Sequence, residues 1–348
     1  MTAAQALRSE AAGRILIKDG AYGTLIQQRR LQSRDYCGGL DLLKDQRGNN
    51  DLLNITNPDI VHSICESFAD AGAEILATNT FNANAISQAD FGAEALVPRI
   101  NRASAEIVRG VADAYTAKDG KARWVAGAMG PTNKTLSLSP NVNDPAFREV
   151  DFDQVKAVYR EQVDALVEGG VDFILIETIF DTLNAKAAIM ATLEAEQGLG
   201  RELPLMISMT LTDLSGRNLS GHTVEAFWAS VRHAKPITIG LNCSFGAAQL
   251  RPHLAALSAI ADTLVMAYPN AGLPNELGEY DEAAEQTAAQ VRDWARSGLV
   301  NIVGGCCGTT PLHIAAIAGA VRDCTPRAAP AAQSGTLLAG LEPMVIAA

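Results

Sequence analysis

The sequence predicts an α/β fold, a (β/α)8 TIM barrel with enlarged loops at the carboxyl-terminal face of its strands. Two observations predict it: eight buried apolar runs recur along the chain, and each is followed by a stretch with helical periodicity. The runs lack polar alternation, as expected of parallel strands that are covered on both faces. A length of 348 residues leaves room for eight such repeats and for long loops between them.

The predicted strands are rich in Ile, Leu, Val and Ala, and they occupy residues 15–19, 74–78, 124–128, 173–177, 205–209, 238–242, 263–267 and 300–304. Several of the helical stretches begin at Asn, Asp or Thr and stop at Gly or Pro, which is the usual punctuation of helices. These stretches occupy residues 57–72, 98–115, 151–168, 181–197, 223–233, 246–260, 281–297 and 310–323.

A doubly wound open sheet is the rival architecture, and its nucleotide-binding turn would read Gly-x-Gly-x-x-Gly after an early strand. The first turn instead reads Asp19-Gly-Ala-Tyr-Gly23, so the barrel is preferred. Residues 31–54 and 130–145 are expected to be long loops, the usual place for substrate walls in such barrels. We expect a barrel domain at 14–324, preceded by a lead-in at 1–13 and followed by an Ala- and Pro-rich linker or tail at 325–348.

Composition restricts the partners and the compartment. A net charge of -11 argues against nucleic acid or an anionic membrane surface as the main partner. The chain has no run of 18 apolar residues and no signal-peptide pattern at its start, so we expect a cytoplasmic protein. Six cysteines in a chain of this length, two of them adjacent, favour metal binding or catalysis over a disulfide framework.

Three of these cysteines follow predicted strands. Cys306 and Cys307 lie in a glycine-lined turn after the eighth strand, and Cys243 follows the sixth. The carboxyl ends of barrel strands meet at one rim, so we expect the three sulfurs to converge. Taken alone, a cysteine at a strand end is more often a small buried residue than a ligand. Three thiolates with one open position, however, match the ligand count of a catalytic zinc.

The remaining cysteines, Cys37, Cys65 and Cys324, do not lie at strand ends, which disfavours a four-ligand structural zinc. An incoming thiol that joins a three-cysteine zinc would lose its proton near neutral pH and become nucleophilic. The pattern therefore favours thiol alkylation over hydrolysis.

Other predicted strand ends carry polar residues. Glu177 ends an apolar strand, where a buried carboxylate needs a partner or a ligand, although a salt bridge to a neighbouring loop would also satisfy it. Asp19 ends the first strand, where it could serve the site or only cap the turn that follows. Asp181 is better explained as a helix N-cap than as a catalytic residue.

At these strand ends the chain resembles the homocysteine S-methyltransferase family, most closely the N-terminal homocysteine-binding module of cobalamin-dependent methionine synthase. The resemblance covers about residues 14–344, and its strongest elements are Gly-Leu-Asn-Cys243, Gly-Gly-Cys306-Cys307-Gly-Thr-Thr-Pro, Asp19-Gly-Ala-Tyr-Gly-Thr and Tyr268-Pro-Asn-Ala-Gly-Leu-Pro-Asn275. The last element, with Gly130-Pro-Thr-Asn-Lys-Thr and Asn143-Asp-Pro-Ala-Phe147, favours the cobalamin-dependent branch over relatives that use betaine or S-methylmethionine.

The resemblance implies that Cys243, Cys306 and Cys307 hold Zn2+ and that the homocysteine sulfur takes the fourth position. It also implies that Asn270 approaches the zinc when substrate is absent.

For the rest of the substrate, the resemblance implies that Glu177 binds the homocysteine ammonium, with help from Asp19. The backbone N–H groups of Ala21, Tyr22 and Gly23 would receive the carboxylate, because glycine-rich turns can form anion-binding nests.

The chain contains no Asp-x-His-x-x-Gly pattern of the kind that anchors cobalamin. Methylcobalamin is therefore expected from a separate chain or module, a cobalamin- and folate-binding part of methionine synthase, whether this chain is a naturally split subunit or an excised fragment. Two alternatives stay open: a stand-alone methyltransferase that uses S-methylmethionine or betaine, and a non-catalytic module that binds a thiol or zinc.

Overall fold

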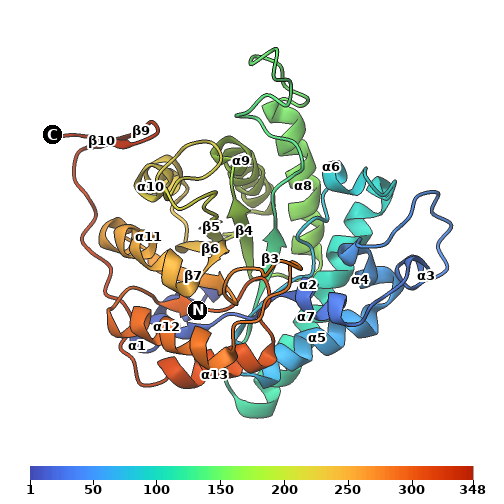
Figure 1. The fold of residues 1–348 in the computed structure, drawn as a ribbon, viewed down its shortest axis with the longest axis horizontal. Coiled ribbons are helices and arrows are strands. Elements are labelled where there is room, and N and C mark those ends of the chain that lie inside the picture. The colour runs from blue at the N-terminus through green and yellow to red at the C-terminus, as the bar shows by residue number, and fades with distance from the viewer. Residues whose placement is uncertain (348) are drawn as a thin grey trace.

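The computed structural model describes residues 1–347 and contains the predicted (β/α)8 barrel (Figure 1). Its strands are β1 Leu16–Ile17, β2 Ile75–Ala77, β3 Trp124–Met129, β4 Phe173–Ile179, β5 Leu205–Met209, β6 Thr238–Gly246, β7 Leu264–Asn270 and β8 Ile302–Val303. They form one parallel sheet in the order β1-β8-β7-β6-β5-β4-β3-β2, and a bridge between Lys18 and Ile75 connects the two end strands. Each predicted apolar run therefore overlaps one barrel strand, and β3, β4, β6 and β7 extend beyond the predicted ends.

The helices surround this barrel. They are α1 Ala3–Gly13, α2 Tyr22–Gln28, α3 Ser33–Cys37, α4 Leu53–Thr56, α5 Pro58–Asp70, α6 Ala85–Gln88, α7 Val97–Asp119, α8 Phe152–Glu168, α9 Thr182–Leu199, α10 Val224–Val231, α11 Ala247–Ile260, α12 Ala284–Arg296 and α13 Pro311–Val321. The eight predicted stretches correspond to α5 and to α7 through α13. Asp181 is the N-cap of α9, where its carboxylate accepts from the N–H groups of Leu183 and Asn184, so its interpretation as a cap is confirmed.

The N-terminal segment folds as helix α1, whereas the sequence suggested only a lead-in. Thr2 and Gln5 form a capping box at its start. Ala4, Leu7 and Ala11 are buried in a cluster with side chains from the barrel strands, among them Leu16 and Ile75. Two of these three buried residues are alanines, so the apolar face of the helix was too weak to be recognised from the periodicity of the sequence.

The first long loop and the C-terminal tail also contain regular structure. Short elements interrupt the loop at α3, at the 3-10 helix η1 Asn50–Leu52 and at α4. The tail ends in an antiparallel hairpin, β9 Thr336–Ala339 with β10 Pro343–Ile346, which lies beside α10 (Figure 1). Segments this short give no periodic signal that sequence patterns can detect.

Buried Arg327 ties the start of the tail to the barrel. Its guanidinium donates to the carbonyl oxygens of Ser258, Ala261 and Thr263, at and just beyond the carboxyl end of α11. A cation at this position also interacts favourably with the partial negative charge of a helix C-terminus. The first residues after α13 are therefore held against the barrel.

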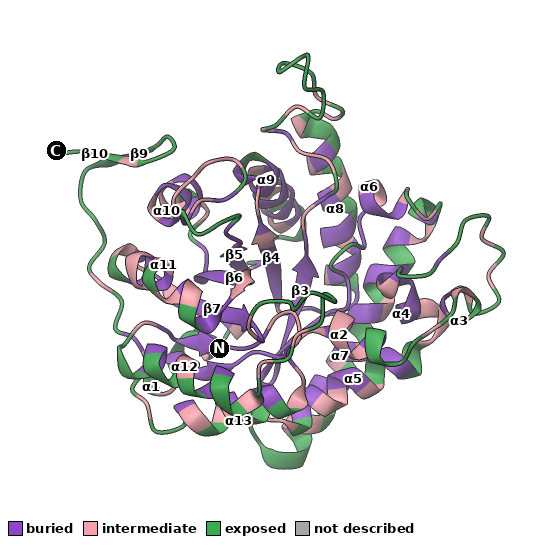
Figure 2. Cartoon of the chain, in the orientation of Figure 1, coloured by how far each residue is buried: buried purple, intermediate pink, exposed green. Residues whose placement is uncertain are grey.

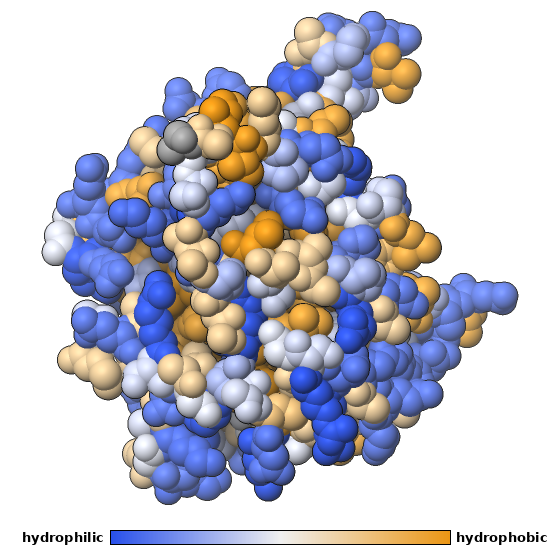
Figure 3. Space-filling view, turned by 90° about the vertical axis from the view of Figure 1, so that its left-hand side faces the viewer, coloured by the Kyte–Doolittle hydropathy of each residue, from blue (hydrophilic) through white to orange (hydrophobic). Residues whose placement is uncertain are grey.

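Burial follows the layers of the barrel. The strands and the inward faces of the helices are buried, while the outward helix faces are exposed (Figure 2). The face that carries the C-terminal hairpin is mostly hydrophilic, with apolar surface near the hairpin (Figure 3), where Leu338, Leu341 and Met344 are exposed. Within residues 1–347, no helix is both long and apolar enough to cross a membrane.

Close packing between β6 and β7 leads to a prediction at Gly240. A Cβ atom there would lie 2.1 Å from the carbonyl oxygen of Met266 and 2.6 Å from its Cγ. We expect Gly240→Ala to lower the free energy of unfolding by about 1–3 kcal/mol, as overpacking does in other cores. The control is Gly110→Ala in α7, where a Cβ would meet nothing within 4 Å.

The control should stabilise the protein by up to about 1 kcal/mol, because alanine restricts the unfolded chain. Urea denaturation measures both variants, and equal stabilities would contradict the packing at Gly240.

Candidate metal centre and substrate pocket

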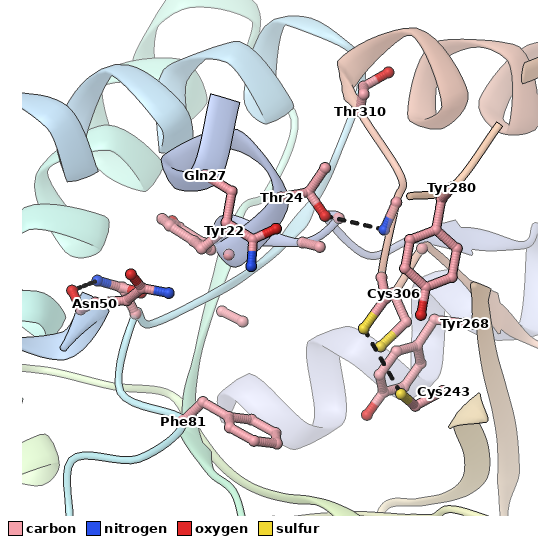
Figure 4. Close-up of a pocket in the computed structure, with 18 of the residues that line it drawn as sticks. Tyr22, Thr24, Gln27, Asn50, Phe81, Cys243, Tyr268, Tyr280, Cys306 and Thr310 are labelled. Carbon is pink, nitrogen blue, oxygen red and sulfur yellow. Dashed lines mark hydrogen bonds between the residues drawn. The ribbon is translucent and has the colours of Figure 1, made fainter. Parts of the chain in front are cut away.

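The three cysteines that follow predicted strands lie in one cluster. Cys243 comes from the end of β6, and Cys306 and Cys307 come from the turn after β8. Their sulfur atoms all lie within 4.8 Å of one another, and the Sγ atoms of Cys243 and Cys307 are 3.8 Å apart. Figure 4 shows the sulfurs gathered at one wall of a pocket. The cluster can therefore hold a metal ion.

The backbone leaves regular strand geometry to bring these sulfurs together. Cys243 and Ser244 have φ angles of 62° and 61°, in the left-handed region that non-glycine residues seldom adopt. The pairing of β6 with β7 shifts register between Asn242 and Gly246. Such conformations cost about 1–3 kcal/mol each and concentrate at functional sites.

Two asparagines hold the cysteines in place. The amide nitrogen of Asn242 lies 3.8 Å from the Sγ of Cys306, and its amide oxygen accepts from the hydroxyl of Ser208 at 2.7 Å. Asn270, at the end of β7, accepts from the backbone N–H of Cys307 at 3.1 Å. Both asparagines are buried, so these contacts fix the orientation of the thiols.

The electrostatics of the cluster call for a cation. Hydrogen bonds from Cys243 and Cys306 lower the pKa of Cys307 to about 3, while hydrogen bonding to Cys243 and Cys307 raises the pKa of Cys306. A positive ion between the three sulfurs would stabilise them as thiolates. Three sulfur donors suit a soft ion such as Zn2+, which in catalytic sites keeps three protein ligands and one open position.

The cysteines line a cavity of about 910 Å³ at the carboxyl-terminal face of the barrel (Figure 4). The walls come from the turn after β1, the ends of β2, β4 and β7, and the connection between β7 and α12. The residues with side chains or turns in these walls include Lys18, Ala21, Tyr22, Gly23, Asn50, Asp51, Asn79, Phe81, Glu177, Tyr268 and Tyr280.

Glu177 lines this cavity near the carboxyl end of β4. Its Oε2 accepts from the hydroxyl of Tyr268 at 2.9 Å, and burial raises the pKa of its carboxyl group, opposed by the charge of Lys18 and by Tyr268. The next residue, Thr178, has a φ of 58°, which is unusual for a β-branched residue, and its N–H donates to Asn242. The backbone at Glu177 is thus held by the same asparagine that contacts Cys306.

Asp19 lies behind the cavity wall. It is fully buried, its Oδ1 accepts from the Nζ of Lys18 at 2.8 Å, and its Oδ2 accepts from the N–H of Ala77 at 2.7 Å. Among the described residues, Lys18 lines the cavity and Asp19 does not. Asp19 therefore reaches the site through Lys18.

The turn that follows has unpaired donors. Ala21 caps α2 without a side-chain hydrogen bond, and within residues 1–347 the N–H groups of Ala21, Tyr22 and Gly23 donate to no backbone acceptor. All three residues line the cavity. These N–H groups are therefore available to an anionic group of a ligand.

Sequence reasoning missed Lys18 and Tyr280 as pocket residues. Lys18 could have been noticed, because it is a charged residue that directly follows three apolar residues of the predicted strand. Tyr280 lies in the irregular connection between β7 and α12, and its side chain stands beside the cysteines (Figure 4). No local pattern marks that position, since only the folding of the connection brings the ring there.

Comparison with known proteins agrees with this site. Residues 16–321 match the family described as homocysteine S-methyltransferase. The chain belongs to this family. Its fold is also similar to that of the homocysteine methyltransferase MmuM from Escherichia coli in its metallated form, with a TM-score of 0.68, 22% identity, and coverage of 88% of this chain and 96% of that chain.

The apo form of the same Escherichia coli protein matches with a TM-score of 0.64 and 21% identity, over 88% of this chain and 96% of that one. At this level of identity, these two structures show a shared fold. Membership of the family rests on the match to residues 16–321, which include all three clustered cysteines.

A buried carboxylate on the cavity wall gives a pH prediction. Asp51 lies in η1, its Oδ1 accepts from the N–H of Asn82 at 3.1 Å, and burial raises its pKa to about 7. The folded protein thus binds a proton that the unfolded chain releases near pH 4, so stability falls as pH rises from about 4 to 7.

Asp51→Asn keeps the hydrogen-bond acceptor but cannot ionise. We expect its free energy of unfolding to exceed that of the natural protein by an amount that grows to about 2–4 kcal/mol as pH rises across this range. Denaturant titrations at several pH values measure this, with the exposed Asp41→Asn as control. A stability difference that does not change with pH would contradict the burial of an ionisable group at residue 51.

Proposed function

We propose that this member of the homocysteine S-methyltransferase family activates the thiol of homocysteine on Zn2+ for methyl transfer and so forms methionine. We further propose that it acts as the homocysteine-binding subunit or module of a cobalamin-dependent methionine synthase. One observation carries the proposal: three sulfurs on two strand ends form a single cluster in the wall of a cavity that also contains a buried carboxylate.

Cys243, Cys306 and Cys307 would hold the Zn2+ ion, and their arrangement in one cluster supports this assignment. A bound Zn2+ would lower the pKa of the substrate thiol, so that the nucleophilic thiolate is present at neutral pH. Asn242 and Asn270 orient the cysteines by hydrogen bonds. A role for Asn270 as a fourth ligand in the thiol-free protein is part of the proposal, supported by its burial against Cys307.

The rest of the pocket would hold the amino-acid part of homocysteine. Glu177 would bind the ammonium, since within residues 1–347 Tyr268 bonds its Oε2 and no donor bonds its Oε1. The N–H groups of Ala21, Tyr22 and Gly23 would bind the carboxylate, because they have no backbone acceptor. Fixing both ends of the substrate aligns its sulfur with the incoming methyl group.

Methylcobalamin would be delivered by a separate cobalamin- and folate-binding chain or module that docks at the carboxyl-terminal face of the barrel. The loop before α8, which includes the resemblance at Asn143–Phe147, is exposed there and projects from the barrel (Figure 1). A cytoplasmic location belongs to the same proposal, and the free state of all six cysteines supports it.

The proposal is tested by giving zinc-loaded protein and homocysteine one methyl donor at a time. We expect methionine from methylcobalamin and none from S-methylmethionine or betaine. Methionine from either of those two donors would replace the proposal with a stand-alone methyltransferase. Binding of zinc and thiol without transfer from any donor would instead favour a non-catalytic module.

A further inference from the structure

We propose that Lys18 and Glu177 form a charge pair that recognises both ends of an α-amino acid thiol, with Lys18 binding its carboxylate and Glu177 its ammonium. This inference rests on the proposed function and extends it, because it names the residue that makes the carboxylate a requirement for binding.

Lys18 is a charged donor at the bottom of the cavity. Its side chain is only 5% exposed, its Nζ lies 2.8 Å from Asp19 Oδ1 and 4.6 Å from the centre of the Tyr268 ring, and it lines the cavity. An ammonium group has three N–H donors. Within residues 1–347, Asp19 is the one side chain that accepts from it, so two donors stay available to a ligand.

Asp19 fixes the position of this ammonium. Both of its carboxylate oxygens are occupied, one by Lys18 and the other by the N–H of Ala77 in β2. It does not line the cavity and so has no contact with a ligand there. Lys18 is thus pre-organised by a partner that cannot compete for the substrate ammonium.

Glu177 is the complementary acceptor. Within residues 1–347 it forms no ion pair with Lys18, and Tyr268 contacts both groups, with its ring 4.6 Å from the Lys18 Nζ and its hydroxyl bonded to Glu177. A ligand ammonium at Glu177 alone would face the positive charge of Lys18 nearby. A carboxylate on the same ligand removes that repulsion when it lies between the ammonium and Lys18.

The turn after β1 completes the carboxylate subsite. Its N–H groups at Ala21, Tyr22 and Gly23 start three residues after Lys18 and line the same cavity. These backbone N–H groups and the Lys18 ammonium line the same cavity. An anion there gains both a charge partner and hydrogen-bond donors.

The test compares three thiols on zinc-loaded protein: homocysteine, 3-aminopropane-1-thiol, which lacks the carboxylate, and 4-sulfanylbutanoate, which lacks the ammonium. Dissociation constants are measured by calorimetry for the natural protein, Lys18→Met and Glu177→Gln. The exposed Lys121→Met serves as a matched control.

We expect Lys18→Met to raise the dissociation constant of homocysteine about 10- to 100-fold and to leave that of 3-aminopropane-1-thiol unchanged or lower, because Lys18 repels the ammonium of this ligand. Glu177→Gln should raise the dissociation constant of homocysteine by a similar factor, while that of 4-sulfanylbutanoate changes by less than about threefold. If Lys18→Met weakened the binding of homocysteine and of 3-aminopropane-1-thiol equally, the assignment would be overturned, because Lys18 would then have only a structural role.

Lys18→Met leaves Asp19 buried without its counter-ion, so the variant could fail to fold. The double variant Lys18→Met with Asp19→Asn removes both charges and should show the same pattern; equal weakening of both thiols in it would likewise overturn the inference. A natural protein that binds homocysteine no better than 3-aminopropane-1-thiol overturns the inference but leaves the proposed function standing. Zinc-loaded protein that binds none of the three thiols overturns the proposed function itself.

Discussion

Replacing Cys306 by Ser is expected to lower zinc affinity and methyl transfer from methylcobalamin by at least about 100-fold, more than the loss of a residue that only supports a ligand. The hydroxyl of serine is a far weaker donor to Zn2+ than a thiolate. The two remaining sulfurs, Cys243 and Cys307, would then leave the site with fewer ligands than a catalytic zinc requires.

Zinc content after dialysis and the rate of methionine formation measure this effect. Cys37→Ser is the matched control, because Cys37 ends α3 and does not belong to the cluster. Unchanged zinc content and turnover in the Cys306 variant would refute the role of the cluster.

Glu177→Gln is expected to lower kcat/KM for homocysteine about 100-fold while zinc content stays unchanged. The variant keeps the size of the side chain but removes the buried charge that would bind the substrate ammonium, and loss of a charged hydrogen bond costs about 1.5–3 kcal/mol. Tyr268→Phe, which removes only the hydrogen bond to Glu177 Oε2, should have a smaller effect of about tenfold.

Steady-state kinetics with varied homocysteine separate these variants, and metal analysis confirms that each keeps its zinc. If Glu177→Gln lost zinc as well as activity, the carboxylate would support the metal site and not the substrate. If its kcat/KM matched that of the natural protein, the ammonium would bind elsewhere.

The barrel was predictable because its strands are apolar runs with no polar alternation, and such runs are typical of parallel strands under helices. Convergence of Cys243 with Cys306 and Cys307 followed from the same topology, since strand carboxyl ends share one rim. The backbone angles that aim the thiols could not be predicted, because they depend on the register shift between β6 and β7.

The structure places Lys18 in the cavity wall and Asp19 behind it, and the sequence could not predict this arrangement. Neighbouring residues of a strand point to opposite faces. Which of the two side chains points into the barrel depends on the register in which β1 pairs with β8, and a single sequence does not reveal that register. Tyr280 was out of reach for another reason: it sits in a connection without periodicity, and only its packing against Gly308 brings it to the cysteines.

Zinc K-edge X-ray absorption, recorded before and after addition of homocysteine, tests the central claim most directly. We expect three sulfur neighbours and one lighter atom around each zinc in the free protein, and four sulfur neighbours once homocysteine is bound. Two results would contradict the claim that three cysteines bind the zinc and leave one position for the substrate thiol. One is fewer than three sulfur neighbours in the free protein, and the other is a count that stays at three when homocysteine is saturating.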